Sequence, residues 1–265
     1  MSNSAPATPP AHAVERTIDP LVDPIVISDL HLTNERPRTV ERFLRFMRED
    51  APAHRELVIL GDLFDFWIGD DAGAAAAPVI AALAAASHAG QRVLVMHGNR
   101  DLLLGRDFAR TTGSVLLADP IVVDVAGTRT LLSHGDAWCT LDVAYQTFRA
   151  MVREPEFQRE FLAKPVAERI AVARGARMQS ETEKAVKAMD IMDVTPAAIA
   201  TAMATAGVYR MIHGHTHRPA AHVIDLNGRT AERWVLPDWD LDDAEPRGGF
   251  IDFLDGRPRL VFFDD

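Results

Sequence analysis

The stretch PIVISDLH, residues 24–31, decides how this chain folds. Its first part is a short, mainly apolar run, as in a buried strand, and it leads directly to Asp29 and His31. Functional crevices of open α/β sheets lie beyond the carboxyl ends of the strands. Repeats of this pattern therefore predict strands that deliver polar residues to one edge. Four more apolar runs end just before a polar group: ELVIL (56–60), QRVLVM (91–96), RTLLS (129–133) and YRMI (209–212).

The polar residues after these runs form a set of candidate metal ligands. Two carboxylates, one amide oxygen and four imidazoles suit divalent Mn, Fe, Zn or Ni and differ from a thiolate centre. Ordinary turns and helix caps also use such residues. That alternative would require all five apolar runs to lead to a candidate ligand by chance. We therefore expect a binuclear metal site that hydrolyses phosphate esters. The seven candidate ligands are Asp29, His31, Asp62, Asn99, His134, His215 and His217.

Composition restricts the class of protein. The chain has 265 residues, of which 48% are hydrophobic, so it can bury a large core. The single cysteine, Cys139, excludes an internal disulfide framework and is interpreted as a structural thiol. The net charge of −10 argues against nucleic-acid binding. Without an apolar run of about 20 residues or a signal-like N-terminus, we expect a cytoplasmic protein, with residues 1–24 as a disordered extension.

Strand and helix signals alternate in the first half of the chain. Helical patterns over Thr39–Glu49 and from Pro78 to Ala86 separate the first three strands, which indicates βαβ units. From Val115 onward the predicted strands are separated only by turn residues, so hairpins replace crossovers. We expect two sheets packed together with helices outside. The later predicted strands are Val115–Leu117, Ile121–Val125, Arg129–Ser133, Ala221–Leu226, Arg233–Leu236, Gly249–Phe253 and Arg259–Phe263.

A long helical insertion separates the strand regions. Leu141–Ala206 is helical in pattern and is interrupted by Pro155, Pro165 and Pro196. Between Tyr145 and Asp190 it carries nine basic and seven acidic residues, so this segment is locally positive in an acidic protein. One interpretation is an insertion packed on the body. We favour a cap over the metal-binding edge, because the insertion starts just after His134 and ends before His215.

The polar blocks and their surroundings resemble a known family. The blocks are similar to those of the calcineurin-like metallophosphoesterases. Longer stretches resemble, within that superfamily, the UDP-2,3-diacylglucosamine pyrophosphatases of lipid A biosynthesis. These stretches are GDLFDFWIGDD (61–71), HGNRDLLLG (97–105), HGDAWCTLDVAYQTFR (134–149), IMDV (191–194) and HGHTHRP (213–219).

This resemblance implies an α/β (α+β-like) fold, a four-layer αββα sandwich with a helical cap, and two Mn²⁺ ions. It implies a metallophosphoesterase core over residues 25–140 and 207–265 and a cap over 141–206. The implied enzyme is a monomer attached peripherally to the cytoplasmic face of the inner membrane of Gram-negative bacteria. Water activated by two metals would attack the phosphorus next to uridine in the lipid-linked nucleotide sugar, giving UMP and 2,3-diacylglucosamine 1-phosphate.

The resemblance also implies roles for individual residues. Asp62 would bridge the two metals, which two-metal hydrolysis holds roughly 3.5–4 Å apart. His97 and His213 are expected to bond backbone or pack rather than bind metal, and Asp101 and Asp136 to support the turns. The implied ligands of one metal are Asp29, His31 and His217, and those of the other are Asn99, His134 and His215.

Arg100 departs from the wider superfamily, in which this position is often a histidine that handles a proton. A guanidinium keeps a fixed positive charge and contacts two phosphate oxygens at once. That suits a leaving group that needs no protonation, such as a phosphate monoester. We expect Arg100 and Asn99 to be the catalytic residues. The implied substrate contacts are Asn99, Arg100, Asp142, Ser180, Lys184, Lys187 and His215.

Two other functions remain open from the sequence. A general phosphodiesterase of the same superfamily would have an identical metal site and differ only in substrate. A catalytically silent scaffold would have lost a ligand, and no block lacks one. Metal analysis and a substrate comparison separate these alternatives.

Overall fold

The strands form two sheets within residues 14–186 and 193–263, which the computed structural model describes. The first sheet has the order β11-β10-β1-β2-β3-β4 and the second has the order β5-β6-β7-β9-β8. The first contains β1 (Pro24–Ile27), β2 (Glu56–Leu60), β3 (Arg92–Met96), β4 (Val115–Leu117), β10 (Gly249–Leu254) and β11 (Arg257–Phe262). The second contains β5 (Ile121–Val125), β6 (Thr128–Ser133), β7 (Arg210–His213), β8 (Ala220–Leu226) and β9 (Arg229–Val235).

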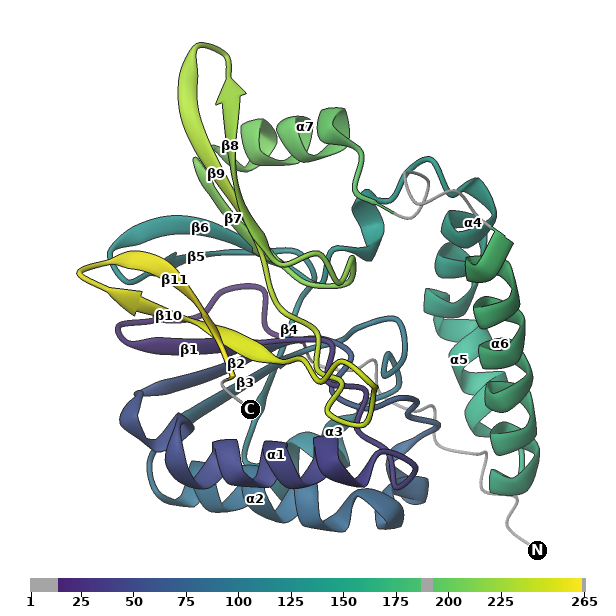
Figure 1. The fold of residues 1–265 in the computed structure, drawn as a ribbon. Helices are drawn as coiled ribbons and strands as arrows, with labels where there is room; N and C mark the ends of the chain where they lie inside the picture. The colour runs from purple at the N-terminus through teal and green to yellow at the C-terminus, as the bar shows by residue number, and fades with distance from the viewer. Residues whose placement is uncertain (1–13, 187–192, 264–265) are drawn as a thin grey trace, which may run out of the picture.

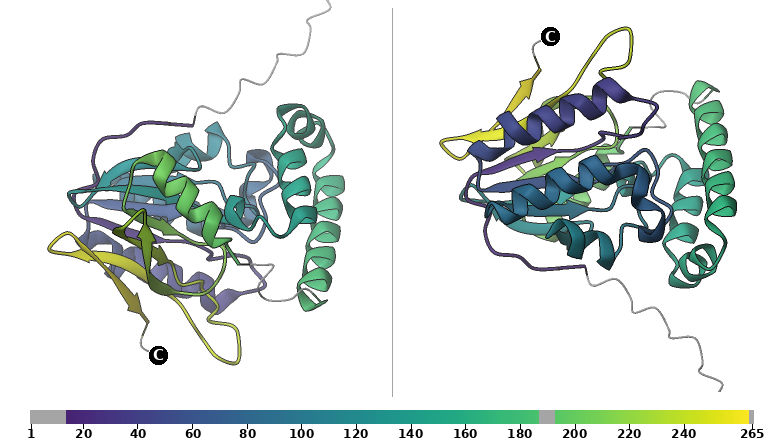
Figure 2. Two further views of the ribbon diagram at one scale, coloured as in Figure 1. Left: turned by 90° about the horizontal axis from the view of Figure 1, so that it is seen from above. Right: turned by 90° about the horizontal axis from the view of Figure 1, so that it is seen from below.

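The two sheets lie face to face between helices, as Figure 1 shows. Figure 2 shows helices crossing the first sheet in the view from below and α7 crossing the second in the view from above. The predicted four-layer αββα arrangement is confirmed. Against the first sheet lie α1 (Pro37–Glu49), α2 (Ala77–His88) and α3 (Arg106–Thr112), and against the second lies α7 (Pro196–Ala206).

Three apolar cores hold these layers together. Phe43, with α2 and α3, packs on the outer face of the first sheet; Val58 and Ile212 meet between the sheets; and Met203 packs on the second sheet. Burying each such side chain contributes about 1.5–3 kcal/mol. Cys139 belongs to the third core, and burial raises its pKa to about 12, which fits the structural thiol expected from the sequence.

The central strands are parallel, so their carboxyl ends lie together. In the first sheet β1, β2, β3 and β4 pair in parallel. In the second, β6 pairs in parallel with β7, and β7 with β9. Residues of β1 and β2 are all buried because both faces of the sheet are covered. The loops after these strands are therefore gathered at one edge of the sandwich.

One predicted connection is wrong. We expected hairpins from Val115 onward, but β4 pairs with β3 in the first sheet and β5 pairs with β6 in the second. The Asp119-Pro120 turn thus carries the chain from one sheet to the other. The apolar pattern of both strands is satisfied in either arrangement, because each faces the core between the sheets.

The start of the described chain packs against the body. Glu15 forms a bridge with Leu117, and Leu21 forms one with Val125. Leu21 is fully buried in the core between the sheets. Residues 1–13, the first part of the expected extension, lie outside the described residues.

The insertion divides into two parts. At one end of the sandwich stand α4 (Val143–Arg153), α5 (Pro155–Leu162) and α6 (Val166–Val186), as Figures 1 and 2 show. The last helix, α7, instead packs on the second sheet as a layer of the body. Both α5 and α7 begin with a proline, whose missing N–H would be unpaired in a first helical turn anyway. Residues 187–192, between α6 and α7, lie outside the description.

Two arginines of α6 bind acidic residues of the loop after β2. Arg169 is 2% exposed, and its guanidinium donates to the Asp71 carboxylate and to the Ile68 carbonyl. Arg177 pairs with Asp65, which is buried. These two positive charges therefore hold α6 against the body, whereas the sequence analysis counted them toward the positive balance of the cap.

We expect Arg169→Met to destabilise the attachment of α6 by about 1.5–3 kcal/mol, because it removes hydrogen bonds to a charged group. Limited proteolysis should show earlier cleavage within α4 to α6, and the urea midpoint should fall. Arg159→Met is the matched control, since Arg159 is 48% exposed and, within the described residues, its one ion pair is with Glu156, at 3.9 Å. Equal effects of the two substitutions would contradict the tether.

Candidate metal centre

Loops at one edge of the sandwich carry the candidate ligands. Each loop follows one of five strands, which are β1, β2 and β3 in the first sheet and β6 and β7 in the second. Because the sheets face each other, loops from both reach the same place. The residues that meet there are Asp29, His31, Asp62, Asn99, His134, His215 and His217.

Asp29, His31 and His217 form the first donor group. One ligand atom from each lies within 4.8 Å of the others. His217 Nε2 is 3.4 Å from His31 Nε2 and 3.5 Å from Asp29 Oδ1. A carboxylate and two imidazoles whose ligand atoms lie this close can surround one divalent ion.

Asp62, His134 and His215 form the second donor group, with ligand atoms again within 4.8 Å. Asn99 adds an oxygen, since its Oδ1 is 3.0 Å from His134 Nε2. His134 Nδ1 lies 2.9 Å from the Leu60 carbonyl, and a proton donated there leaves Nε2 available to a metal.

The carboxylate of Asp62 lies between the two donor groups. Its Oδ2 is 3.8 Å from His31 Nε2 and 3.7 Å from His134 Nε2. Its Oδ1 accepts a hydrogen bond from the backbone N–H of Arg100, at 2.8 Å. Asp62 is the carboxylate that approaches ligand atoms of both groups, as a bridging role requires.

Buried atoms of this site fit a bound cation. Asp29 Oδ1 is buried and accepts no hydrogen bond within the described part of the chain. Such an oxygen costs free energy unless a cation or a donor satisfies it. The donors are imidazole nitrogens and carboxylate and amide oxygens, the set that Mn, Fe and Zn accept. The residues present therefore fit two divalent ions.

The backbone of the donor groups is strained. Left-handed conformations of non-glycine residues cost about 1–3 kcal/mol each and cluster at functional sites. Here the strand pairing continues into the loops, because Leu30 and His31 both donate backbone hydrogen bonds to the Asp62 carbonyl. Five candidate ligands have positive φ: Asp29 (56°), His31 (47°), Asp62 (52°), His215 (69°) and His217 (53°).

Glycines beside the ligands allow the loops to approach each other. A Cβ on Gly98 would lie 2.0 Å from Asp62 Oδ1, and one on Gly214 would lie 2.2 Å from Asp29 Oδ2. Both distances are far below van der Waals contact. The Gly-Asn and Gly-His pairs of the sequence are therefore required for packing around the ligands.

The chain is similar to known proteins. The model of the calcineurin-like phosphoesterase family matches residues 24–219. The chain belongs to this family. A protein of Bordetella pertussis named UDP-2,3-diacylglucosamine hydrolase is 48% identical over 241 residues, which cover 89% of this chain and 93% of that protein. Proteins of the same name are 48% identical in Aromatoleum aromaticum, covering 83% of this chain and 90% of theirs, and in Stenotrophomonas maltophilia, covering 81% and 90%.

This member of the calcineurin-like phosphoesterases is a metal-dependent hydrolase. Within the family it stands with the relatives named UDP-2,3-diacylglucosamine hydrolase. Among the residues that the structure describes, no helix is long and apolar enough to cross a membrane.

Two other acidic residues support the phosphoesterase site. Asp101 is fully buried and accepts backbone N–H groups from both the Asp62 loop and the Gly98 loop. Asp136 accepts from the Tyr145 hydroxyl and from Arg149, both on α4. The Tyr145 ring in turn stacks on His215, at 5.9 Å between ring centres. Asp101 thus fixes the loops, and Asp136 fixes the start of the cap beside the second donor group.

His97 and His213 bond to backbone, as the sequence predicted. His97 Nε2 donates to the Leu104 carbonyl at 2.7 Å. His213 Nδ1 donates to the Gly214 carbonyl at 2.8 Å, while its Nε2 faces Arg233. Burial and Arg233 lower the pKa of His213 to about 4.

The structure describes some of the residues expected to contact substrate and not others. Arg100 follows Asn99 beside the second donor group and is half-buried. Asp142 caps α4, where its Oδ1 accepts from the Tyr145 N–H. Ser180 and Lys184 belong to α6, but their side chains lie outside the description, and so does all of Lys187.

In the second donor group, a proton competes with a cation for His134 below the pKa of this residue. Burial alone would lower the pKa of His134, but the Asp62 and Asp29 carboxylates raise it to about 9. Burial and His134 lower the pKa of His215 to about 3. In the absence of a cation, His134 therefore carries the proton at neutral pH.

We expect Mn²⁺ binding to release about one proton per chain at pH 7, because His134 must be neutral to act as a ligand. The apparent affinity of that site should rise about tenfold per pH unit from pH 7 until it levels off near the His134 pKa of about 9. Isothermal titration in two buffers of different ionisation enthalpy measures the released proton. An affinity independent of pH, with no proton released, would contradict this prediction.

The sequence analysis missed one residue of the site, Asp238. It follows β9, and its Oδ2 lies 3.3 Å from His217 Nδ1. The signal was present, because an apolar strand run ending at Leu236 leads into Pro237-Asp238, as in the other five loops. What the sequence did not reveal is that β9 pairs in parallel with β7 and so ends at the same edge.

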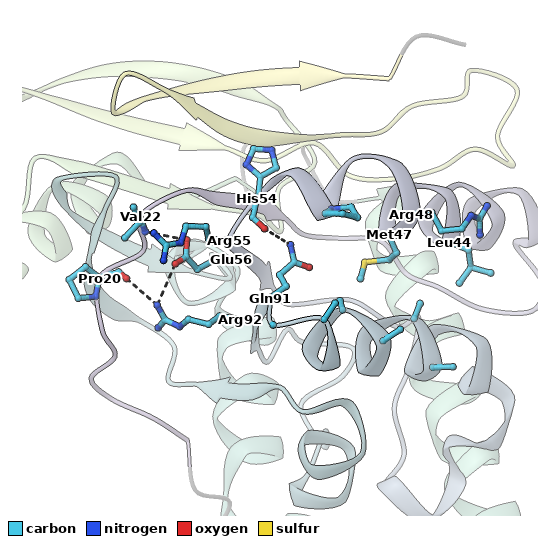
Figure 3. A pocket seen from close by; sticks show the side chains of 17 residues that line it. Pro20, Val22, Leu44, Met47, Arg48, His54, Arg55, Glu56, Gln91 and Arg92 are labelled. Atoms are coloured by element: carbon cyan, nitrogen blue, oxygen red, sulfur yellow. Dashed lines mark hydrogen bonds and ion pairs between the residues drawn. The ribbon is translucent and has the colours of Figure 1, made fainter.

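A separate cavity of about 800 Å³ lies at the opposite edge of the first sheet (Figure 3). Its walls are the facing sides of α1 and α2, and its base is formed by Arg55, Glu56, Gln91 and Arg92, where β2 and β3 begin. The donor groups follow the other ends of these strands. The candidate metal ligands therefore lie away from this cavity.

Proposed function

We propose that this enzyme hydrolyses the pyrophosphate bond of UDP-2,3-diacylglucosamine in lipid A biosynthesis, with UMP and 2,3-diacylglucosamine 1-phosphate as products. The observation that carries the proposal is the pair of donor groups with Asp62 between them, in a chain 48% identical to a relative named UDP-2,3-diacylglucosamine hydrolase. We propose Mn²⁺ as the ion at both positions. Asp29, His31 and His217 would hold one, Asn99, His134 and His215 the other, and Asp62 both.

Two such ions, when bound, polarise a phosphoryl oxygen and lower the pKa of a water molecule. The side chains supply the rest of the chemistry. Arg100 has a fixed positive charge and a planar group that matches two phosphate oxygens, so it would bind the pyrophosphate and counter the charge that develops. The leaving phosphate monoester is stable as an anion near neutral pH, and the reaction therefore needs no proton donor at this position.

We also propose that α4 to α6 form the cap that recognises the acylated glucosamine phosphate. The core would then comprise residues 25–140 and 207–265 together with α7, the part of the expected cap (141–206) that packs on the second sheet. Contacts of Tyr145 with His215 and Asp136 support this, since they join α4 to the metal-binding edge. Ser180, Lys184 and Lys187 would meet the substrate from this cap, together with Asp142. Asn99, Arg100 and His215 would meet it from the core.

We propose a monomer that works at the cytoplasmic face of the inner membrane, where a lipid-linked substrate resides. Exposed apolar side chains at the root of the cap support this location: Leu141 is 59% exposed and Val143 is 70% exposed. Apolar residues of this kind contribute binding when they enter a lipid interface. Sedimentation with phospholipid vesicles, compared for the parent and a Leu141→Ser, Val143→Ser variant, tests the surface.

The deciding experiment is hydrolysis of UDP-2,3-diacylglucosamine in ¹⁸O-labelled water, followed by mass spectrometry. We expect UMP release with added Mn²⁺, no release after a chelator, and the label in UMP, because the phosphorus next to uridine is attacked. Label in the sugar phosphate would overturn the proposed site of attack. Hydrolysis of bis(p-nitrophenyl) phosphate with none of the nucleotide sugar would favour a general phosphodiesterase.

A further inference from the structure

Asp238 is a buried carboxylate in contact with a candidate ligand. It is 4% exposed, and its Oδ2 lies 3.3 Å from His217 Nδ1. The other ring nitrogen, Nε2, lies 3.4 Å from His31 Nε2 and 3.5 Å from Asp29 Oδ1. The two nitrogens of His217 therefore have different partners, with Asp238 on one side and the first donor group on the other.

The segment around Asp238 is tied to the same loops. The Trp239 N–H donates to the Asp29 carbonyl at 3.0 Å, so the neighbouring residue is bonded directly to a candidate ligand. Arg247 Nε donates to Asp238 Oδ2 at 2.9 Å. Asp240 and Arg247 exchange two backbone hydrogen bonds, at 2.8 and 3.0 Å, which hold Arg247 in place. Asp238 is thus held through its side chain by Arg247 and through the neighbouring backbone by Asp29.

We infer that Asp238 is a positioning residue for the first donor group: it accepts the Nδ1 proton of His217 and so turns the Nε2 lone pair toward Asp29 and His31. Imidazole ligands commonly donate their second N–H to a carboxylate, which fixes the tautomer and ring orientation and makes the ligand more basic. The inference rests on the proposed two-metal function. It adds a residue from a sixth strand end to the five that carry the ligands.

The alternative is that Asp238 serves only as the partner of Arg247. The chain offers a matched pair that separates the two roles. Asp252 is 7% exposed and accepts from Arg259 Nε at 2.9 Å, and both residues lie on the β10–β11 hairpin. It is a buried aspartate paired with an arginine, and it belongs to neither donor group. Loss of an ion pair alone should therefore have the same effect at either position.

The test is Mn²⁺ binding to the full chain, measured by isothermal titration and by equilibrium dialysis. We expect the parent to bind two ions. Asp238→Ala should weaken one of them about 10–100-fold and leave the other unchanged. Asp238→Asn keeps an acceptor oxygen and should lose less. Asp252→Ala should bind both ions as the parent does, and Arg247→Gln, which keeps the Asp238 carboxylate but removes its arginine partner, should lose less than Asp238→Ala.

The outcomes separate this inference from the function. Parent-like binding of both ions by Asp238→Ala would overturn the positioning role, as would an equal loss in Arg247→Gln or Asp252→Ala. If Asp238→Ala fails to fold, the comparison of Asp238→Asn with Arg247→Gln decides by the same criterion. A parent that binds two ions but releases no UMP would overturn the proposed substrate and leave the role of Asp238 standing. A parent that binds no Mn²⁺ would overturn both.

Discussion

Asp62→Ala should lower the turnover of UDP-2,3-diacylglucosamine about 10³-fold in Mn²⁺, which corresponds to about 4 kcal/mol of transition-state stabilisation. The reason is the position of Asp62 Oδ2, 3.8 Å from His31 Nε2 and 3.7 Å from His134 Nε2. In the proposed site, one substitution would therefore remove a ligand that both ions share. Steady-state kinetics and metal analysis of the purified variant measure the two losses.

The fold should survive this substitution. Burial, with Asp29 nearby, raises the pKa of Asp62, so the ionised carboxylate costs folding free energy at neutral pH when no cation compensates it. We expect the metal-free variant to melt no lower than the metal-free parent, and the stabilisation that Mn²⁺ gives the parent to shrink. Asp65→Ala, three residues along the same loop, should retain both ions. Near-normal activity of Asp62→Ala would contradict the bridging role.

Local sequence patterns predicted the strands and the loops that carry ligands, because each strand is apolar along its length and stops at a polar residue. PIVI and ELVIL are buried at every position. Their unbroken apolar runs therefore identify them as strands without any need to know which residues face which side of the sheet. The pairing of the strands was harder to predict from the sequence. β4 and β5 have the same apolar character, and only the tertiary structure assigns them to different sheets.

The same limit explains Asp238. Its segment follows a strand as the other candidate ligand loops do, but the sequence does not reveal that β9 lies beside β7.

Charges in the cap show a second limit of prediction from sequence. Arg169 and Arg177 contribute to the positive balance of the insertion, yet both pair with acidic residues of the body. A count of charges does not reveal which of them are already neutralised by partners distant in sequence.

Arg100→Ala should lower turnover about 10²–10³-fold, the loss found when a preorganised donor to a developing negative charge is removed. Arg100→Lys should recover little, because a point charge lacks the planar pair of donors. The main chain should stay in place in each variant. The Arg100 backbone N–H donates to Asp62 Oδ1 and its carbonyl accepts from the Trp67 N–H, and neither bond uses the side chain.

The histidine variant decides between charge and proton transfer at this position. If Arg100 acts by fixed charge, Arg100→His should be impaired across pH 6.5–8.5 and should improve toward low pH, where the imidazole becomes charged. Arg110→Lys is the control, since Arg110 is 79% exposed and pairs only with Asp107 within α3 among the described residues. A histidine variant that matched the parent at neutral pH would show that proton donation is what the position supplies. In the proposed reaction the leaving phosphate needs no proton, so a fixed charge would account for an arginine beside Asn99.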